Sequence, residues 1–149
     1  MKILYVDSSI VVSYYLPSEL GHARAVELID DPETAVVTSR LTQIEVTGAL
    51  VRAARAGRVG GIDPSEVINR FNADLSGGPI TLVGADQAKV ESLALNLVRN
   101  QGIRALDALH VAVAAIVLPE LSGPGDEALF ATCDAEQSDA AKACGLLTA

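Results

Sequence analysis

Four acidic residues occupy positions that solvation alone does not explain. Asp7 and Asp134 each follow directly on a short run of strand-forming residues. Glu45 lies in a predicted helix with no other charge close by, and Asp107 is in the first turn of an almost wholly apolar predicted helix. Carboxylates that lie together repel one another unless cations hold them. Because ligand sets made only of oxygen select hard ions, we expect these four residues to bind Mg²⁺ or Mn²⁺.

The chemistry that suits such a site is hydrolysis of a phosphodiester. A bound divalent ion lowers the pKa of a water and orients it for in-line attack, and the same ion or a second one stabilises the leaving oxygen. No histidine is needed as a general base. We therefore interpret Asp7, Glu45, Asp107 and Asp134 as candidate catalytic residues as well as metal ligands.

Each of these acids also has an ordinary structural explanation. Asp7 and Asp134 can cap the helices that follow them, and a carboxylate near a helix start, such as Asp107, is favoured by the helix dipole. Glu45 is harder to explain, because a carboxylate is seldom found on a core-facing stripe without a partner. At helical spacing, the residues that share its face and predict such a stripe are Leu41, Ile44, Gly48 and Ala49.

Four further residues are candidates for supporting roles. Ser9 follows the first acid by two positions and can donate a hydrogen bond to it. His110 lies one turn after Asp107, where it can support the site or be an ordinary histidine of the core or an interface. Arg52 and Arg55 are also one turn apart and predict either a local track for phosphates or a solvated helix face.

The elements that must position these residues alternate along the chain. Spacing and turn signals predict strands over 2–6, 35–38, 80–83 and 128–133, with a short edge strand at 146–147. Helices are predicted over 10–16, 22–29, 41–56, 64–75, 86–100, 105–118 and 136–144, and a loop over 119–127. This alternation favours an α/β sandwich with a mainly parallel sheet. Ligands bind beyond the carboxyl ends of such strands, so we expect the site near Asp7 and Asp134.

Length and composition narrow the functional classes. With 149 residues, half of them apolar, we expect a single domain over 1–149. A net charge of −8 with only three lysines excludes a broad basic surface for binding nucleic acid. Any nucleic acid must therefore be bound by a local group of residues. No apolar stretch suits a membrane span or a secretory leader, so a cytoplasmic protein is expected. Cys133 and Cys144 lack metal-site spacing and are expected to be buried free thiols.

Four segments together resemble the motifs of PIN-domain nucleases. They are 7–9 at the end of the first strand, 42–45 ending in Glu45, 106–110 containing Asp107 and His110, and 132–134 ending in Asp134. Their order and the chain length resemble the VapC-type toxins of bacterial toxin-antitoxin modules. The resemblance implies a three-layer α/β/α sandwich, Mg²⁺ or Mn²⁺ held by the four acids, and endonucleolytic cleavage of RNA. It also implies a homodimer and a cognate antitoxin that blocks the site.

Two details are left open at this stage. The connection 119–127 is longer than the resemblance leads us to expect and contains Asp126, so Asp126 or Asp139 are alternatives to Asp134 as the fourth acid. An apolar patch beside the Glu45 helix predicts a groove for an antitoxin helix, although ordinary core is the favoured explanation for three of its members, Val11, Val12 and Leu16. The full patch is Val11, Val12, Tyr14, Tyr15 and Leu16.

Other families with similar alternation fit poorly. A receiver domain needs an aspartate after a central strand and a lysine after a late strand, and no lysine follows Cys133 closely. A haloacid-dehalogenase phosphatase needs a second acid two positions after Asp7, where Ser9 stands. Neither a G-x-G-x-x-G motif nor a P-loop is present. The remaining alternative is a non-catalytic PIN-like protein that binds or regulates, which the presence of all four acids disfavours.

Overall fold

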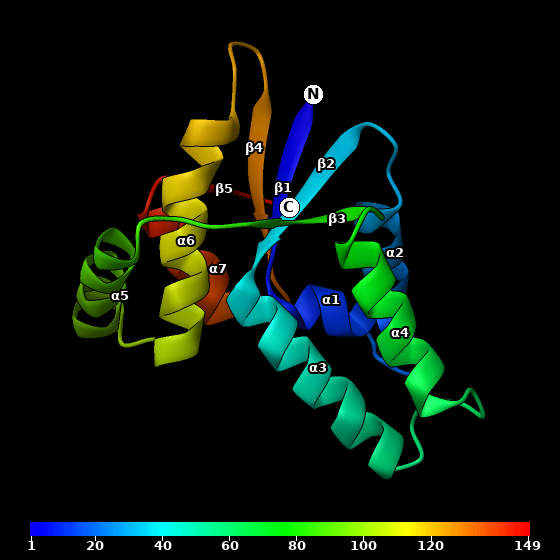
Figure 1. Cartoon of the computed structure of the whole chain (residues 1–149). Helices are drawn as coiled ribbons and strands as arrows, with labels where there is room; N and C mark the ends of the chain where they lie inside the picture. The colour runs from blue at the N-terminus through cyan, green and yellow to red at the C-terminus, as the bar shows by residue number, and fades with distance from the viewer.

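The protein is built around one five-stranded sheet in which every strand pair is parallel (Figure 1). The computed structural model describes residues 1–149. The strands lie in the order β3-β2-β1-β4-β5, and their bounds are β1 (Lys2–Val6), β2 (Thr34–Ser39), β3 (Ile80–Val83), β4 (Glu127–Ala131) and β5 (Leu147–Thr148). This confirms the predicted parallel sheet, including its short edge strand.

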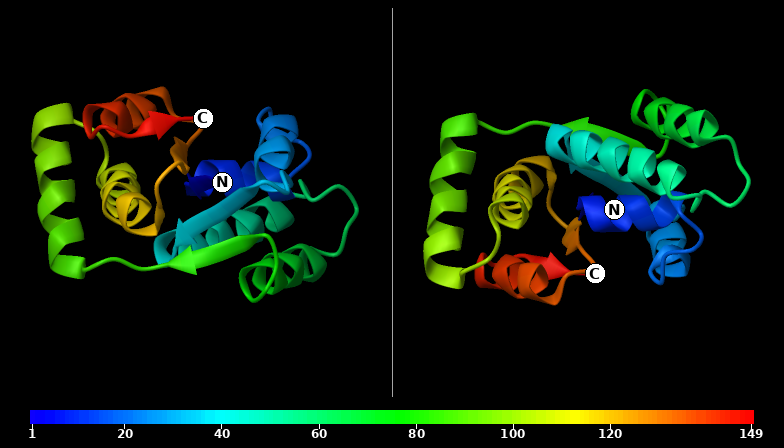
Figure 2. Two further views of the ribbon diagram at one scale, coloured as in Figure 1. Left: turned by 90° about the horizontal axis from the view of Figure 1, so that it is seen from above. Right: turned by 90° about the horizontal axis from the view of Figure 1, so that it is seen from below.

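Seven helices complete a three-layer α/β/α sandwich. The first four helices pack on one apolar cluster, and the last three helices pack on the other. Figure 2 shows these two groups of helices on either side of the sheet. Their bounds are α1 (Ser8–Tyr15), α2 (His22–Ile29), α3 (Arg40–Arg55), α4 (Pro64–Leu75), α5 (Gln87–Gln101), α6 (Ala105–Leu121) and α7 (Ala135–Ala143). None of them combines the length and apolarity that a bilayer crossing needs.

The central strand β1 is buried on both faces. Ile3 and Tyr5 enter the cluster beneath α5–α7, while Leu4 and Val6 enter the cluster beneath α1–α4. Side chains of a strand alternate between its faces, so a strand covered on both sides reads as a continuous apolar run. The chain therefore leaves the middle of the sheet at Asp7, inside the protein rather than at its rim.

The turn between α5 and α6 depends on a glycine. Gly102 ends α5 with φ of 67°, a left-handed conformation in which a side chain is strained. Its amide donates to the carbonyl of Val98. The chain can then reverse within three residues, so that α6 packs along α5 and its first turn, with Asp107, reaches the carboxyl edge of the sheet.

Helix α6 is longer than predicted. It continues through Pro119 to Leu121, whereas the sequence analysis placed a loop from residue 119. A proline costs a helix one backbone hydrogen bond and adds steric strain, and here the last turn is held by the amide of Ser122, which donates to Leu118. The strand that was predicted over 128–133 begins at Glu127 and ends earlier, at Ala131.

Three expectations about burial are wrong in whole or in part. The buried face of α3 runs through Thr42, Val46, Leu50 and Ala53, and Ile44 is 71% exposed, so Glu45 lies at the border of the core rather than in a core stripe. In the patch predicted as an antitoxin groove, the favoured explanation of ordinary core is confirmed for Val11 and Leu16 and wrong for Val12, which is only half-buried, and Tyr14 and Tyr15 are buried as well. Both cysteines are free as expected, but Cys133 is exposed and Cys144 only half-buried.

Candidate functional site

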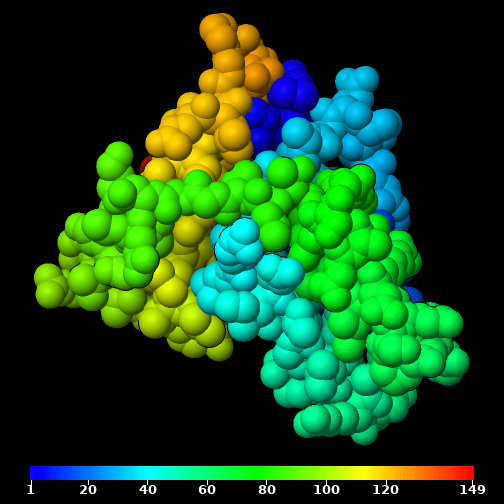
Figure 3. All heavy atoms as spheres, in the orientation of Figure 1, coloured from blue at the N-terminus to red at the C-terminus, as the bar shows by residue number.

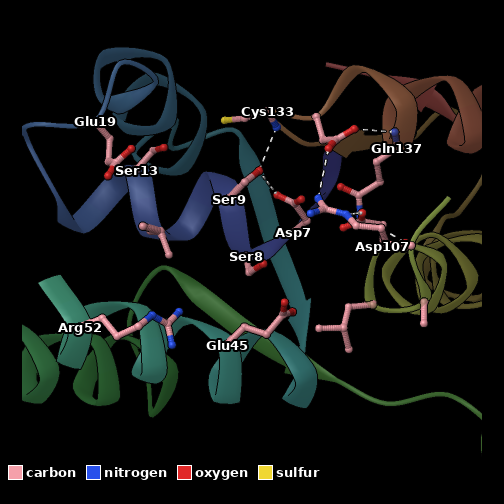
Figure 4. A pocket seen from close by; sticks show the side chains of 15 residues that line it. Asp7, Ser8, Ser9, Ser13, Glu19, Glu45, Arg52, Asp107, Cys133 and Gln137 are labelled. Carbon is pink, nitrogen blue, oxygen red and sulfur yellow. Dashed lines mark hydrogen bonds and ion pairs between the residues drawn. The ribbon is translucent and has the colours of Figure 1, made fainter.

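A cavity of about 640 Å³ opens at the carboxyl edge of β1 and β4, where the sequence analysis placed the site. All four predicted acids line it. In Figure 4, Glu45 and Arg52 project from α3 on one side, and Asp7, Asp107 and Gln137 lie on the other. In the space-filling view, α3 lies beside α6 at the surface (Figure 3). Residues far apart in the sequence thus meet because parallel strands end at the same edge.

Asp7 is held by neutral donors. It caps α1, and its Oδ1 accepts from the Ile10 amide at 3.1 Å and from Ser9 Oγ at 2.6 Å. Its Oδ2 accepts from Thr132 Oγ1 at 2.8 Å. Burial raises the pKa of the Asp7 carboxyl, and these three hydrogen bonds oppose part of that increase. The predicted contact of Ser9 with the first acid is therefore present.

Glu45 is held by a buried histidine. Its Oε1 lies 2.5 Å from Nε2 of His110, and the other ring nitrogen, Nδ1, lies 3.3 Å from the hydroxyl of Tyr5. Burial raises the pKa of Tyr5, so its phenol keeps its proton and can donate to Nδ1. Nε2 of His110 can therefore donate to the carboxylate of Glu45 while Nδ1 faces the phenol. His110 is thus both a satisfied core histidine and a support for Glu45.

Asp107 and Asp134 share one guanidinium. Nε of Arg104 lies 2.9 Å from Oδ2 of Asp107, and Nη2 lies 3.5 Å from Oδ2 of Asp134. Asp134 also caps α7, where its Oδ1 accepts from the Gln137 amide at 3.0 Å. Asp107 first, and then Asp134, raise the pKa of Arg104. Sequence reasoning missed Arg104, although its position one turn before Asp107 was a signal for an ion pair.

Two buried polar residues connect the elements beneath the acids, and both were missed. Thr132 Oγ1 lies 2.6 Å from Oε1 of Gln137 as well as contacting Asp7. Nε2 of Gln137 donates to the backbone carbonyl of Asp107 at 3.2 Å. This network joins the ends of β1 and β4 to α6 and α7. The sequence contained only a weak signal, because a glutamine three residues after a capping aspartate is also an ordinary helix start.

Of the remaining candidate site residues, some line the cavity and others lie outside it. Arg52 lines the cavity, whereas Arg55 is exposed and lies outside it, so the predicted phosphate track is reduced to one residue there. Asp126 binds the N-terminal amine at 3.1 Å at the opposite edge of the sheet. Asp139 is exposed and pairs with Lys142. Neither alternative acid reaches the cavity, whereas Asp134 lines it, as does Glu19, an acid that the sequence analysis did not single out.

Comparison with known proteins now adds to this geometry. The sequence model of the PIN domain family matches residues 4–143. The chain belongs to the PIN domain family. No curated protein matches its sequence.

Solved structures with the same fold as this PIN domain come from several bacteria. VapC20 of Mycobacterium tuberculosis, a sarcin-ricin loop cleaving toxin, is 19% identical with a TM-score of 0.65, over 92% of this chain and 94% of that one. VapBC2 of Rickettsia felis, bound to a DNA fragment from their promoter, is 13% identical with a TM-score of 0.62, over 99% and 97%. FitAcB of Neisseria gonorrhoeae is 17% identical with a TM-score of 0.58, over 97% and 95%.

The donors of the PIN domain cavity fit a hard divalent ion in kind, since five carboxylates line it, the four predicted acids and Glu19. No three of its histidine, cysteine, aspartate or glutamate side chains converge as a preformed ion site. Each of the four predicted acids is instead engaged by donors of the chain itself: Asp7 by hydroxyls and an amide, Glu45 by His110, and the other two by Arg104. Ion binding therefore has to exchange some of these partners.

Proposed function

We propose that this PIN domain, acting as one unit over residues 1–149, is an endoribonuclease that depends on Mg²⁺ or Mn²⁺ and is the toxin of a toxin-antitoxin pair. The observation that carries the proposal is the gathering of four carboxylates from β1, α3, α6 and the end of β4 around one cavity. A ligand set of this kind suits metal-assisted hydrolysis of phosphodiesters. VapC20, which has the same fold, is a toxin that cleaves the sarcin-ricin loop, and this supports RNA as the substrate.

The residues would divide the work as follows. Asp7, Glu45, Asp107 and Asp134 would hold the ion, which when bound supplies the charge that acidifies a water and stabilises the developing phosphate charge. Ser9 and His110 keep the carboxylates of Asp7 and Glu45 oriented through direct hydrogen bonds. Arg52, at the cavity wall, would meet a phosphate of the RNA backbone.

The proposal includes two protein partners. A cognate antitoxin is supported by the similar structures from Rickettsia felis and Haemophilus influenzae, which are VapBC assemblies. The second partner is another copy of this chain, because the resemblance to VapC-type toxins also implies a homodimer. Sedimentation of the purified chain, alone and with the product of a small reading frame beside its gene, tests both partners.

The decisive experiment is cleavage of a structured RNA pool by the purified, antitoxin-free chain. We expect cutting with Mn²⁺ or Mg²⁺ and none with EDTA. Asp107→Asn removes a proposed ligand and should lower the rate by at least about 100-fold, since loss of even an indirect support for a metal ligand often costs 10-fold to 100-fold. Asp139→Asn is the matched control, because it makes the same change at an exposed acid outside the cavity.

The outcomes separate the two candidate functions. Cutting that is lost in Asp107→Asn and kept in Asp139→Asn supports the nuclease and its site. Cutting that survives in both variants places the chemistry elsewhere. If the wild-type chain binds RNA or its antitoxin but never cuts with any ion, the non-catalytic binding or regulatory protein is the better description.

A further inference from the structure

Arg104 is the one positive residue that pairs with Asp107 and Asp134, two of the acids that line the cavity. Its guanidinium contacts Asp107 at 2.9 Å and Asp134 at 3.5 Å, and the structure has no other lysine or arginine in an ion pair with either carboxylate. Arg52 lines the same cavity without an ion pair. One positive charge therefore lies between two carboxylates that belong to different helices, α6 and the start of α7.

The position of Arg104 matters because the same oxygens are the ones that a divalent ion would need. A guanidinium and a metal ion cannot share Oδ2 of Asp107 and Oδ2 of Asp134, since both are cations and both need close approach to the same lone pairs. The side chain of Arg104 is 80% exposed and leaves the acids without disturbing the core. Exposed ion pairs are weak, so displacement by a doubly charged ion is feasible.

We propose that Arg104 is a built-in counter-cation that holds Asp107 and Asp134 in the metal-free protein and competes directly with the divalent ion for them. This inference rests on the proposed function, because the competing ion is the one that the nuclease needs. It assigns two effects to one residue. Arg104 relieves the repulsion between the two acids before the ion arrives, and it lowers the apparent affinity of the site for that ion.

The first test measures Mn²⁺ binding by calorimetry, without RNA. Arg104→Gln should bind Mn²⁺ about threefold to tenfold more tightly than the wild type, the range expected when one or two exposed ion pairs no longer have to be broken. Arg52→Gln is the matched control: it removes the same charge from the same cavity but breaks no ion pair, and its affinity should change less than about twofold. Arg104→Lys, which keeps the charge and loses the planar fork, should fall between wild type and Arg104→Gln.

The second test uses thermal unfolding in EDTA and does not depend on any activity. Arg104→Gln should unfold at a lower temperature than Arg52→Gln, because the two carboxylates lose their shared cation, and saturating Mn²⁺ should remove the difference. Equal or weaker Mn²⁺ binding by Arg104→Gln relative to Arg52→Gln overturns the proposal. So does an unchanged unfolding temperature in EDTA.

The design also distinguishes failure of this inference from failure of the proposed function. Asp107→Asn should lose most of the Mn²⁺ affinity of the wild type. If it does, and Arg104→Gln shows no gain, only the role of Arg104 is wrong. If wild type and Asp107→Asn bind Mn²⁺ equally, the proposed metal site fails, and with it the competition.

Discussion

At the scale of residues, the cavity contains two kinds of carboxylate. Asp7 is buried among neutral donors, so the cost of desolvating its charge is only partly offset. Asp107 and Asp134 face a cation and stay partly exposed. Five acids and two arginines line the cavity, so negative charge is in excess there. Such an excess is expected where a protein is arranged to receive an ion rather than to be most stable without one.

The burial of the Asp7 carboxyl predicts the behaviour of Asp7→Asn in the metal-free protein. The pKa of Asp7 is raised in the folded state, so this group favours folding at acidic pH and loses that contribution as the pH rises through the folded pKa. Asparagine does not titrate and can still cap α1. We expect Asp7→Asn to raise the melting temperature at pH 7 by about 2–4 °C, and the gain to disappear near pH 3.5.

Asp126→Asn is the matched control with the opposite sign. The pKa of Asp126 is lowered by the Gly123 amide and then by the N-terminal amine, so Asp126 stabilises the fold above its unfolded pKa and loses that contribution as the pH falls. Asp126→Asn should therefore lower the melting temperature at pH 7. A pair of variants that shift in the same direction at pH 7 would contradict this account of the cavity.

At the scale of elements, two glycines with different backbones affect the helices that present the acids. Gly102 ends α5 in a left-handed conformation, and a Cβ there would meet nothing within 4 Å. Gly48 lies in the middle of α3, three residues after Glu45, and a Cβ there would meet only Nη1 of Arg52, at 3.2 Å. The effect of a side chain at Gly102 is therefore set by its backbone conformation, and the effect of one at Gly48 is set by helix propensity.

Alanine at these positions should therefore have opposite effects. Gly102→Ala should cost about 1 kcal/mol because its backbone is strained for any side chain. Gly48→Ala should stabilise by up to about 1 kcal/mol through helix propensity, reduced by the small shift of the flexible Arg52 side chain. Urea unfolding at fixed pH measures both. Destabilisation by Gly48→Ala would show that α3 has no room at the cavity wall.

At the scale of the whole molecule, the charge of −8 opposes a polyanionic substrate while local arginines attract it. Long-range repulsion is screened by salt more readily than close contacts are. The Debye length falls from about 30 Å at 0.01 M salt to about 10 Å at 0.1 M. An acidic nuclease should therefore respond to salt differently from a nuclease with a basic surface.

We expect the cleavage rate at low RNA concentration and saturating Mn²⁺ to rise between 0.01 M and 0.1 M salt. The reason is that screening lowers the repulsion during encounter before it weakens the close contacts at the cavity. A dinucleotide substrate, which carries little charge, is the control and should show almost no change. A steep fall with salt for the long RNA would instead indicate a basic track that the present structure does not contain.

The sequence by itself determined the architecture and the edge at which the site lies. Periodicity and turn residues are local properties, and they were enough to place the strands, most helices, and Asp7 and Asp134 at the carboxyl edge of a parallel sheet. Only the tertiary structure decided how side chains pair across elements. The rotation of α3, which buries Val46 and exposes Ile44, follows from packing on the sheet. The contact of Glu45 with His110 and the ion pair of Arg104 with Asp134 depend on distances of a few ångströms between helices, which no local spacing encodes.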